Sequence, residues 1–302
     1  MLILDSIIAK KMRERIPARL DGDPAFRYPS PEKWGAKCLP FSFQSTYKLV
    51  GGRYFYGEAP YKAVVIFFHG MGAGRNAYSQ EIAALAKQGY LVYAYDNSGC
   101  MESQGIVKHG IIQNLVDQEN FFKWLDVDPM AKGYRRYAIG HSWGGNAALC
   151  ALREQYHVDK VVSFAGFDHA SVQAGAKMEK TLRGYFARRY KDLGKLDGLE
   201  LMKNTDKKVL YISGDKDKVV DVDNNYFRFQ KALKDKKNIE FYLVKGRYHQ
   251  PYWTIDAQNY FLDLLKQGVT KSTLDHAIVI DYGRLQQDDP LVMQRVFDFF
   301  AS

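Results

Sequence analysis

The sequence predicts an α/β fold, with a mostly parallel central sheet covered by helices on both faces. From residue 62 onward, apolar runs of strand length alternate with stretches of helical length, which is the pattern of βαβ units. The runs at 63–68 and 161–166 are almost wholly apolar, as expected for strands buried on both faces. In such folds, functional sites lie at the carboxyl ends of the strands.

The expected elements follow one another in a regular order. Residues 41–57 are expected to form two strands joined by a turn at Gly51 and Gly52, since paired glycines favour turns. Helices are expected at 76–90, where Gly89 supplies an end signal, and at 110–125, 144–156, 224–235 and 290–300. The remaining strands are expected at 62–70, 91–99, 135–140, 159–167, 207–217 and 238–246. No role is assigned to the long stretch at 256–289.

The chain is expected to divide into an extension, a core and an insertion. Residues 1–37 form an N-terminal extension with an amphipathic helix, whose apolar residues repeat every four positions among Lys and Arg. This stripe consists of Leu4, Ile8, Met12 and Ile16. We expect the helix to pack on its own domain or on a second subunit, with peripheral contact to an anionic membrane as the alternative. Residues 38–167 and 207–302 form the core, and residues 168–206 interrupt it as a lid or cap.

Composition and charge exclude several classes of function. The net charge is +9, but the basic residues are spread along the chain without a nucleic-acid-binding motif, so no nucleic-acid partner is expected. The longest apolar runs are strand-sized, so no integral membrane segment is expected. The first residues place their charges after the apolar stretch, unlike a secretory signal. Three cysteines without paired spacing indicate reduced thiols and a cytoplasmic location. The oligomeric state is left open.

A serine lies between glycines where a predicted strand is followed directly by a predicted helix. In Gly140-His141-Ser142-Trp143-Gly144, the sharp turn needs small residues on both sides of the serine. The turn presents the Ser142 hydroxyl at the carboxyl end of the strand, and the N–H groups that begin the helix can stabilise an oxyanion. Because an unactivated serine is a poor nucleophile, it needs a base and an acid that orients the base.

Candidates for both partners follow in the order acid, then histidine. Asp215 and Asp217 come at the end of the strand predicted at 207–217, and His249 follows the next strand. Because these strand ends meet at one edge of the sheet, either carboxylate and His249 can meet Ser142 there. His141 lies within the turn itself and is expected to point inward beside the nucleophile. A further loop, His69-Gly70-Met71-Gly72, occupies the place expected for a second oxyanion donor.

Together these motifs resemble the α/β-hydrolase superfamily over roughly residues 39–302. The chain is most similar to monoacylglycerol-lipase-type and related carboxylesterases with a short lid. The resemblance implies that Ser142 is the nucleophile, His249 the general base and Asp217 the acid that orients it. It also implies that the backbone N–H groups of Met71 and Trp143 form the oxyanion hole. Trp143 is bulkier than the Met, Leu or Phe common at its position, which narrows the expected pocket.

The substrate pocket is expected to include His69 and Gly70 and a residue of the lid. The lid carries an apolar stripe at helical spacing, Leu182, Tyr185, Phe186 and Tyr190, with basic residues between them. We expect this stripe to cover an acyl pocket, with Phe186 on its wall, and the basic residues to favour a substrate carboxylate. The alternative is a helix packed on the core with a solvated basic face.

Two other functions fit parts of the sequence. Residues 72–77 fit a dinucleotide-binding glycine pattern, and the next strand ends at Asp96, the place of a ribose-binding carboxylate. An oxidoreductase would leave Ser142 and His249 unexplained. A non-catalytic binding protein on this fold usually lacks a triad member, and none is missing here. The sequence therefore predicts a serine hydrolase that acts on small-molecule acyl esters without metal or cofactor, with a serine aminopeptidase or a thioesterase as alternatives.

Overall fold

The structure is a computed structural model that describes residues 5–6, 8–10, 17–72, 74–107, 110–172, 176–269 and 278–302, with only the backbone of 176 and 177. Within these residues one sheet has the strand order β1-β2-β4-β3-β5-β6-β7-β8. The strands are β1 (Lys37–Gln44), β2 (Lys48–Phe55), β3 (Val64–Phe68), β4 (Leu91–Tyr95), β5 (Arg136–His141), β6 (Val158–Phe164), β7 (Lys208–Gly214) and β8 (Ile239–Val244). The pairs β1–β2 and β2–β4 are antiparallel and the others parallel, which confirms the predicted fold class.

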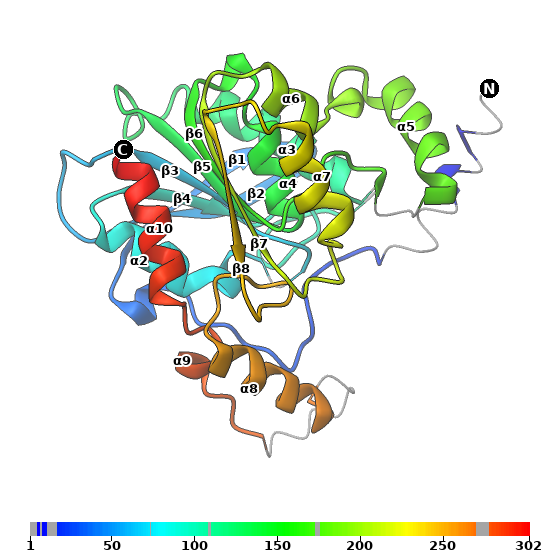
Figure 1. The fold of residues 1–302 in the computed structure, drawn as a ribbon. Helices are drawn as coiled ribbons and strands as arrows, with labels where there is room; N and C mark the ends of the chain where they lie inside the picture. Colours follow the sequence, from blue (N-terminus) through cyan, green and yellow to red (C-terminus); the bar gives the residue numbers. More distant parts are fainter. Residues whose placement is uncertain are drawn as a thin grey trace.

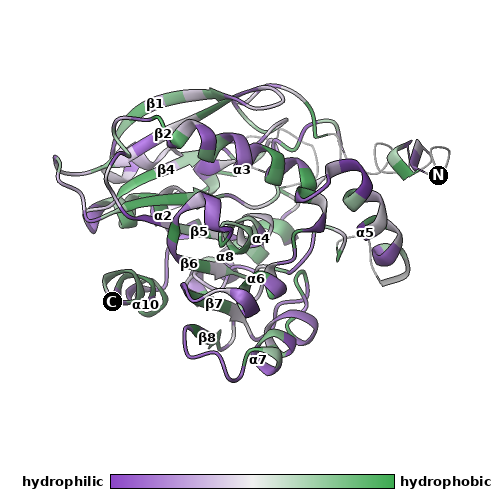
Figure 2. Cartoon of the chain, turned by 90° about the horizontal axis from the view of Figure 1, so that it is seen from above, coloured by the Kyte–Doolittle hydropathy of each residue, from purple (hydrophilic) through white to green (hydrophobic). Residues whose placement is uncertain are grey.

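Helices cover both faces of this sheet (Figure 1). Their bounds are α2 (Ser79–Lys87), α3 (Ile111–Leu125), α4 (Trp143–Cys150), α5 (Ala176–Tyr190), α6 (Gly198–Asn204), α7 (Arg228–Ala232), α8 (Ile255–Lys266), α9 (Tyr282–Leu285) and α10 (Pro290–Ala301). One apolar core contains Phe122 of α3, Ala148 of α4 and Phe229 of α7, and the other contains Ile82 of α2 and Val296 of α10. Figure 2 shows hydrophobic strands between helices that turn hydrophilic residues outward.

The predicted turn at Gly51 and Gly52 is wrong. The chain turns at Ser45, whose N–H donates to the carbonyl of Tyr47, and both glycines lie inside β2. A Cβ at Gly51 would lie 2.5 Å from the Phe41 ring and 2.6 Å from the carbonyl oxygen of Ala94. These glycines therefore allow close packing within the sheet, a second use of glycine in strands.

The segment 168–206 contains α5, the short 3-10 helix η5 (Leu193–Lys195) and α6. The helix α6 lies on the core, since the Gly198 N–H donates to the carbonyl of Asp168 and Leu149 lies beside Gly198. The helix α5 lies at the edge of the molecule, near the N-terminal residues (Figure 1). There Asp5 pairs with Arg188 at 2.5 Å. The predicted domain boundaries stay a prediction.

The N-terminal extension contacts the rest of the chain at several described residues. Ile8 is 5% exposed and belongs to the core that includes α3 and α4. Leu20 donates its N–H to the carbonyl of Gly99, and the Val107 N–H donates to the carbonyl of Ala18. These contacts favour packing of the extension on its own chain. The predicted stripe residues Leu4, Met12 and Ile16 lie outside the described residues.

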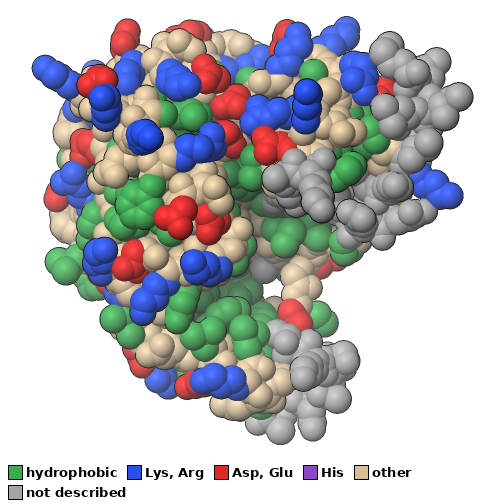
Figure 3. All heavy atoms as spheres, turned by 45° about the vertical axis from the view of Figure 1, so that its right-hand side comes forward, with side chains coloured by type: hydrophobic (Ala, Val, Ile, Leu, Met, Phe, Trp, Pro, Cys, Tyr) green, Lys and Arg blue, Asp and Glu red, His purple; other side chains and the backbone are tan. Residues whose placement is uncertain are grey.

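Three features of the described residues bear on the expectations from composition: the helices, the charged side chains of the surface and the cysteines. In the part of the chain that the structure describes, no helix combines the length and apolar character required to cross a bilayer. On the face shown in Figure 3, Lys and Arg side chains are interspersed with Asp and Glu rather than gathered into one basic patch. Cys38, Cys100 and Cys150 are free thiols.

Candidate active site

Ser142 lies at the turn between β5 and α4. Its backbone has φ 57° and ψ −116°, a conformation that L-residues rarely adopt and that is kept where the surroundings enforce it. A Cβ at Gly140 would lie 2.2 Å from the carbonyl oxygen of Gly144, and one at Gly144 would lie 1.9 Å from that of Phe68. Only glycine therefore fits on either side of the turn, as the sequence predicted.

Asp217 and His249 meet at the carboxyl ends of β7 and β8. His249 Nδ1 lies 2.9 Å from Asp217 Oδ2. The other oxygen of Asp217 accepts the N–H groups of Val219 at 2.8 Å and Val220 at 3.0 Å, and the residue is fully buried. Because the carboxylate only accepts, His249 Nδ1 carries the proton and Nε2 is left for a serine hydroxyl.

Asp215, the second carboxylate of this turn, is used differently. Its Oδ1 accepts the N–H of Gly246 at 2.7 Å, and Lys245 Nζ lies 3.7 Å from its Oδ2. Asp215 therefore ties the loop after β7 to the loop after β8 and does not contact His249.

The predicted oxyanion-hole residues lie at the same edge of the sheet as Ser142, where the strands have their carboxyl ends. Trp143 is the first residue of α4, so its N–H has no acceptor within the helix. Met71 lies in the loop after β3, which is the neighbour of β5 in the sheet. From β3 the chain continues to β4, and from β5 it continues to β6, so the two connections run in opposite directions along the sheet. This arrangement opens a crevice at the carboxyl ends of the strands.

A cavity of about 790 Å³ joins these residues. The wall near the turn at Ser142 includes Gly70, Met71, Ser142, Trp143 and His249. The structure thus brings the predicted nucleophile, base and oxyanion residues to one cavity, while Asp217 lies behind His249, away from the wall.

Two residues predicted for the pocket wall do not lie on it. His69 is 3% exposed, and its Nε2 accepts the N–H of Asn97 at 3.0 Å, which holds the ring beneath the loop. Phe186 is 1% exposed and packs against His169, Tyr185 and Tyr190. The apolar stripe of α5 therefore turns away from the cavity, with Leu182, Tyr185 and Phe186 in the core that also contains residues of α3 and α4. The helix α5 contributes Glu179 and Arg183 to the cavity instead.

Tyr78 is a wall residue that belongs to no sequence motif. Its hydroxyl accepts the Gly70 N–H at 2.9 Å and lies 2.9 Å from His141 Nδ1. His141 Nε2 lies 2.8 Å from the carbonyl oxygen of His249, so Nε2 carries the proton and Nδ1 accepts from Tyr78. Burial lowers the pKa of His141 well below its usual value, which keeps the ring neutral. These contacts link three loops of the candidate site.

The segment at 256–289 braces the histidine loop. Gln258 of α8 accepts the Tyr248 N–H at 2.8 Å and donates to the carbonyl of Gly246 at 3.2 Å. Arg247 donates to the carbonyl of Trp253 at 2.7 Å and pairs with Asp289 at 2.6 Å. The two residues that precede His249, Arg247 and Tyr248, are therefore held by residues that follow His249 in the chain.

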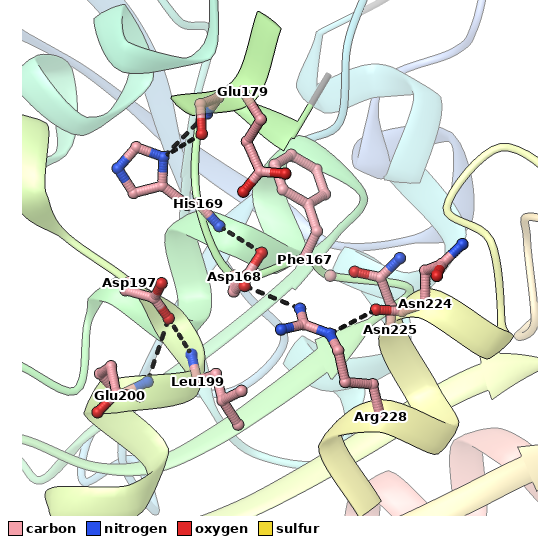
Figure 4. A network of polar contacts seen from close by, with 12 residues as sticks. Phe167, Asp168, His169, Glu179, Asp197, Leu199, Glu200, Asn224, Asn225 and Arg228 are labelled. Carbon is pink, nitrogen blue, oxygen red and sulfur yellow. Dashed lines mark hydrogen bonds and ion pairs between the residues drawn. The ribbon is translucent and has the colours of Figure 1, made fainter. Parts of the chain in front are cut away.

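The other end of the cavity is polar (Figure 4). Asp168, 3% exposed, accepts from Arg228 at 2.8 Å and lies 3.6 Å from Arg183. Arg183 also pairs with Glu179 at 3.0 Å and with Asp197 at 2.9 Å. Ion pairs through Asp168 thus join α5 to α7 at this end. Arg183, one of the basic residues expected to favour a substrate carboxylate, is already paired with acids of this chain.

The carboxylate of the dinucleotide-binding alternative is also occupied. Asp96, 1% exposed, forms an ion pair with Arg75 and accepts the Arg75 N–H at 2.8 Å. A Cβ at Gly74 would lie 2.4 Å from Asp96 Oδ1. This glycine therefore makes room for an aspartate of the same chain, which gives the glycine pattern a structural use.

Comparisons with known proteins agree with this architecture. Residues 63–198 match the family model described as the alpha/beta hydrolase fold, a range that includes Met71 and Ser142 and ends before Asp217. No curated protein matches the chain. The esterase Pf2001 from Pyrococcus furiosus superposes with a TM-score of 0.59 at 22% identity, over 85% of this chain and 97% of that one.

Two further solved structures show the same fold. The acylaminoacyl peptidase of Pyrococcus horikoshii has a TM-score of 0.52 at 18% identity, over 83% of this chain and 44% of that one. The alpha/beta hydrolase GrgF from Penicillium sp. sh18 has a TM-score of 0.55 at 14% identity, over 78% of this chain and 98% of that one. The strand order, the turn at Ser142 and the match over residues 63–198 together identify this chain as a protein of the α/β-hydrolase fold.

Proposed function

We propose that this chain is a serine hydrolase that cleaves carboxylic esters of small molecules through an acyl-enzyme. The observation that carries the proposal is the 2.9 Å contact between Asp217 and His249, with His249 on the wall of the cavity that Ser142 also lines. A buried carboxylate, a histidine and a serine on a strained turn are the parts that activate a hydroxyl for acyl transfer.

In this proposal the Ser142 hydroxyl attacks the ester carbonyl while His249 Nε2 takes its proton. Asp217 keeps Nδ1 protonated and stabilises the imidazolium that forms. The N–H groups of Met71 and Trp143 bind the oxyanion of the tetrahedral intermediate. His249 then gives its proton to the leaving alcohol and takes one from the water that releases the acid. Every step uses groups of this chain, so the proposal needs no metal or cofactor.

The same parts serve a thioesterase or a serine aminopeptidase, because the acyl-enzyme is common to all three reactions. Esterase and peptidase both occur among the structural neighbours, at identities that carry only the fold. Turnover of matched esters, thioesters and aminoacyl amides of one acyl group ranks these activities. We further propose that residues 168–206 act as a lid, because α5 places Glu179 and Arg183 on the cavity wall.

A phosphonylating serine-hydrolase probe tests the proposal directly. Intact-mass analysis is expected to show one adduct on the wild type and none on Ser142→Ala. Ser213→Ala is the matched control, because Ser213 also lies near the carboxyl end of a strand but is 1% exposed and lies off the cavity wall. An unlabelled wild type, or labelling that persists in Ser142→Ala, contradicts the proposed nucleophile.

A further inference from the structure

We propose that the polar end of the cavity is a subsite for a primary ammonium group of the substrate. The inference rests on the proposed function and adds a substrate class to it. The subsite lies between the lid helix and the residues that follow Val220, and its acceptors are Asp221 and Asn225, with Glu179 on the facing wall.

Asn225 supplies a buried acceptor without a donor. The residue is 5% exposed, and its Nδ2 donates to the carbonyl of Asp221 at 3.0 Å, which settles which side of the amide is the oxygen. Its Oδ1 is buried and has no partner among the described residues. Buried polar atoms nearly always have a partner, so this oxygen has an unused capacity to accept a hydrogen bond at the cavity wall. In Figure 4 the Asn225 side chain projects toward Phe167 and Asp168, which also line the cavity.

The backbone at Asn225 has an unusual form. Residues Asp223–Phe227 form a π-helical turn, η6, in which the Phe227 N–H donates to the carbonyl of Val222 at 3.1 Å. Such turns insert one extra residue per turn and occur often at functional sites. Here the turn places Asn224 and Asn225 together on the cavity wall.

Asp221 supplies a carboxylate next to this amide. Its Oδ1 accepts the backbone N–H of Asn224 at 3.0 Å and the side-chain amide at 2.8 Å. Among the described residues, Asp221 forms no ion pair, so its negative charge is available to a ligand.

The cations of this wall are already paired with other acids. Arg183 donates to Glu179 and Asp197, and Arg228 donates to Asp168 and to the carbonyl of Asn224. Three carboxylates (Asp168, Glu179, Asp221) and two guanidinium groups line the cavity here, which leaves the wall one negative charge in a chain whose net charge is +9.

A primary ammonium fits this set of groups best. It carries a positive charge and three N–H donors, which match the carboxylate of Asp221 and the side-chain oxygen Oδ1 of Asn225. A quaternary ammonium supplies the charge without donors. A substrate carboxylate would be repelled by the charge of Asp221. Arg228 Nη1, which has no hydrogen-bond partner among the described residues, would partly offset this repulsion.

The test uses ethyl esters of ω-amino acids of graded chain length, each beside its counterpart ending in methyl, trimethylammonium or carboxylate. Ethanol release gives kcat/KM for every ester. At the preferred length, the ammonium ester is expected to exceed the methyl ester by about tenfold, or about 1.4 kcal/mol, with the trimethylammonium ester between them. A preference for the methyl or carboxylate ester overturns the proposal.

Variants of the wall separate the subsite from a general charge effect. Asp221→Asn and Asn225→Leu are each expected to reduce the ammonium preference several-fold toward unity. Asp223→Asn is the matched control, because Asp223 is an exposed acid of the same turn that lies off the cavity wall. An ammonium preference that survives in both wall variants, or that falls equally in the control, contradicts the assignment.

Binding of n-hexylammonium chloride by calorimetry tests the subsite without turnover. Weaker binding by Asp221→Asn than by Asp223→Asn supports the subsite even when no ester is cleaved. The absence of ester cleavage would then reject only the proposed function. Ester turnover without ammonium preference or binding rejects only the subsite.

Discussion

The His141 ring donates from Nε2 to the carbonyl oxygen of His249 at 2.8 Å, so the residue before the candidate nucleophile holds the backbone of the candidate base. Through Nδ1 the same ring accepts from Tyr78, whose hydroxyl accepts the N–H of Gly70, the residue before the candidate oxyanion donor Met71. One chain of hydrogen bonds thus sets the relative positions of three loops.

Tyr78→Phe is expected to lower kcat about ten- to a hundredfold with a small change in KM, because small misplacements of reacting groups are costly. It leaves the Gly70 N–H and His141 Nδ1 without a partner, which costs about 1–3 kcal/mol of stability per group. Steady-state kinetics and urea unfolding measure both effects. Tyr95→Phe is the matched control, because the buried Tyr95 hydroxyl has no partner among the described residues. Equal kinetic effects in the two variants would mean that the Tyr78 hydroxyl does not position the site.

Asp217→Asn is expected to lower turnover on the order of ten-thousandfold, as the same change does in a comparable triad. The asparagine can still accept from Val219 and Val220, but its amide group would face His249 Nδ1 and favour the wrong tautomer. Asp215→Asn, which alters contacts to Gly246 and Lys245 but none to His249, is expected to cost about tenfold or less. Kinetics with melting curves for both variants decide the assignment, and the reverse order of effects contradicts it.

The parts of the site that could be predicted are those encoded by local motifs. The turn at Ser142 needs Gly140 and Gly144 within the same few residues, and Asp217 and His249 each follow a strand that the apolar pattern reveals. The fold class follows from the same patterns and is confirmed by the sheet.

What could not be predicted depends on residues distant in the chain. The glycines at 51–52 resemble a turn, because the Phe41 ring and the Ala94 carbonyl that exclude a Cβ are visible only after the strands pair. Tyr78 belongs to no motif, and its role arises from two loops that reach it from separate strands. The direction of the α5 stripe depends on how α5 packs against the core that contains residues of α3 and α4, which periodicity does not specify.

Phe186→Ala is expected to destabilise the protein by about 3 kcal/mol or more while leaving the preference for acyl-chain length unchanged. The side chain is 1% exposed, belongs to the core and lies away from the cavity wall, so its loss opens a void in the core rather than enlarging the pocket. Rates with esters of graded length, beside urea unfolding, test this. Leu291→Ala, at a position 77% exposed, is the control and should change neither quantity. A shift in the preference for acyl-chain length would show that Phe186 lines the acyl pocket and would contradict this prediction.

Glu81 of α2 and Asp288 form a carboxyl pair beside the bridge between Trp253 and Asp288. Glu81 is fully buried, and both its oxygens, together with Asp288 Oδ1 and Trp253 Nε1, have no partner among the described residues. Burial raises the pKa of Glu81 to about 8, and burial and the charge of Glu81 raise the pKa of Asp288. The nearby carboxylate of Asp289, which pairs with Arg247, adds to the rise in the pKa of Asp288. Tyr28, Tyr78 and Tyr252, which also lie near the pair, have raised pKa values and stay neutral over the relevant range.

A carboxyl whose pKa is higher in the folded state stabilises the fold fully below its unfolded pKa, and that stabilisation is lost as the pH rises. For Glu81 the loss runs from its ordinary value of 4.5 to about 8, at about 1.4 kcal/mol per pH unit. Glu81→Gln removes the ionisation and keeps the shape, so it is expected to be more stable than the wild type at pH 8, with the difference shrinking toward pH 5. Urea unfolding between pH 5 and 8 measures this, with the exposed Glu58→Gln as control. A difference that stays constant across this range would show that Glu81 does not hold its proton in the fold, because only a group that titrates differently in the two states can tilt the stability curve.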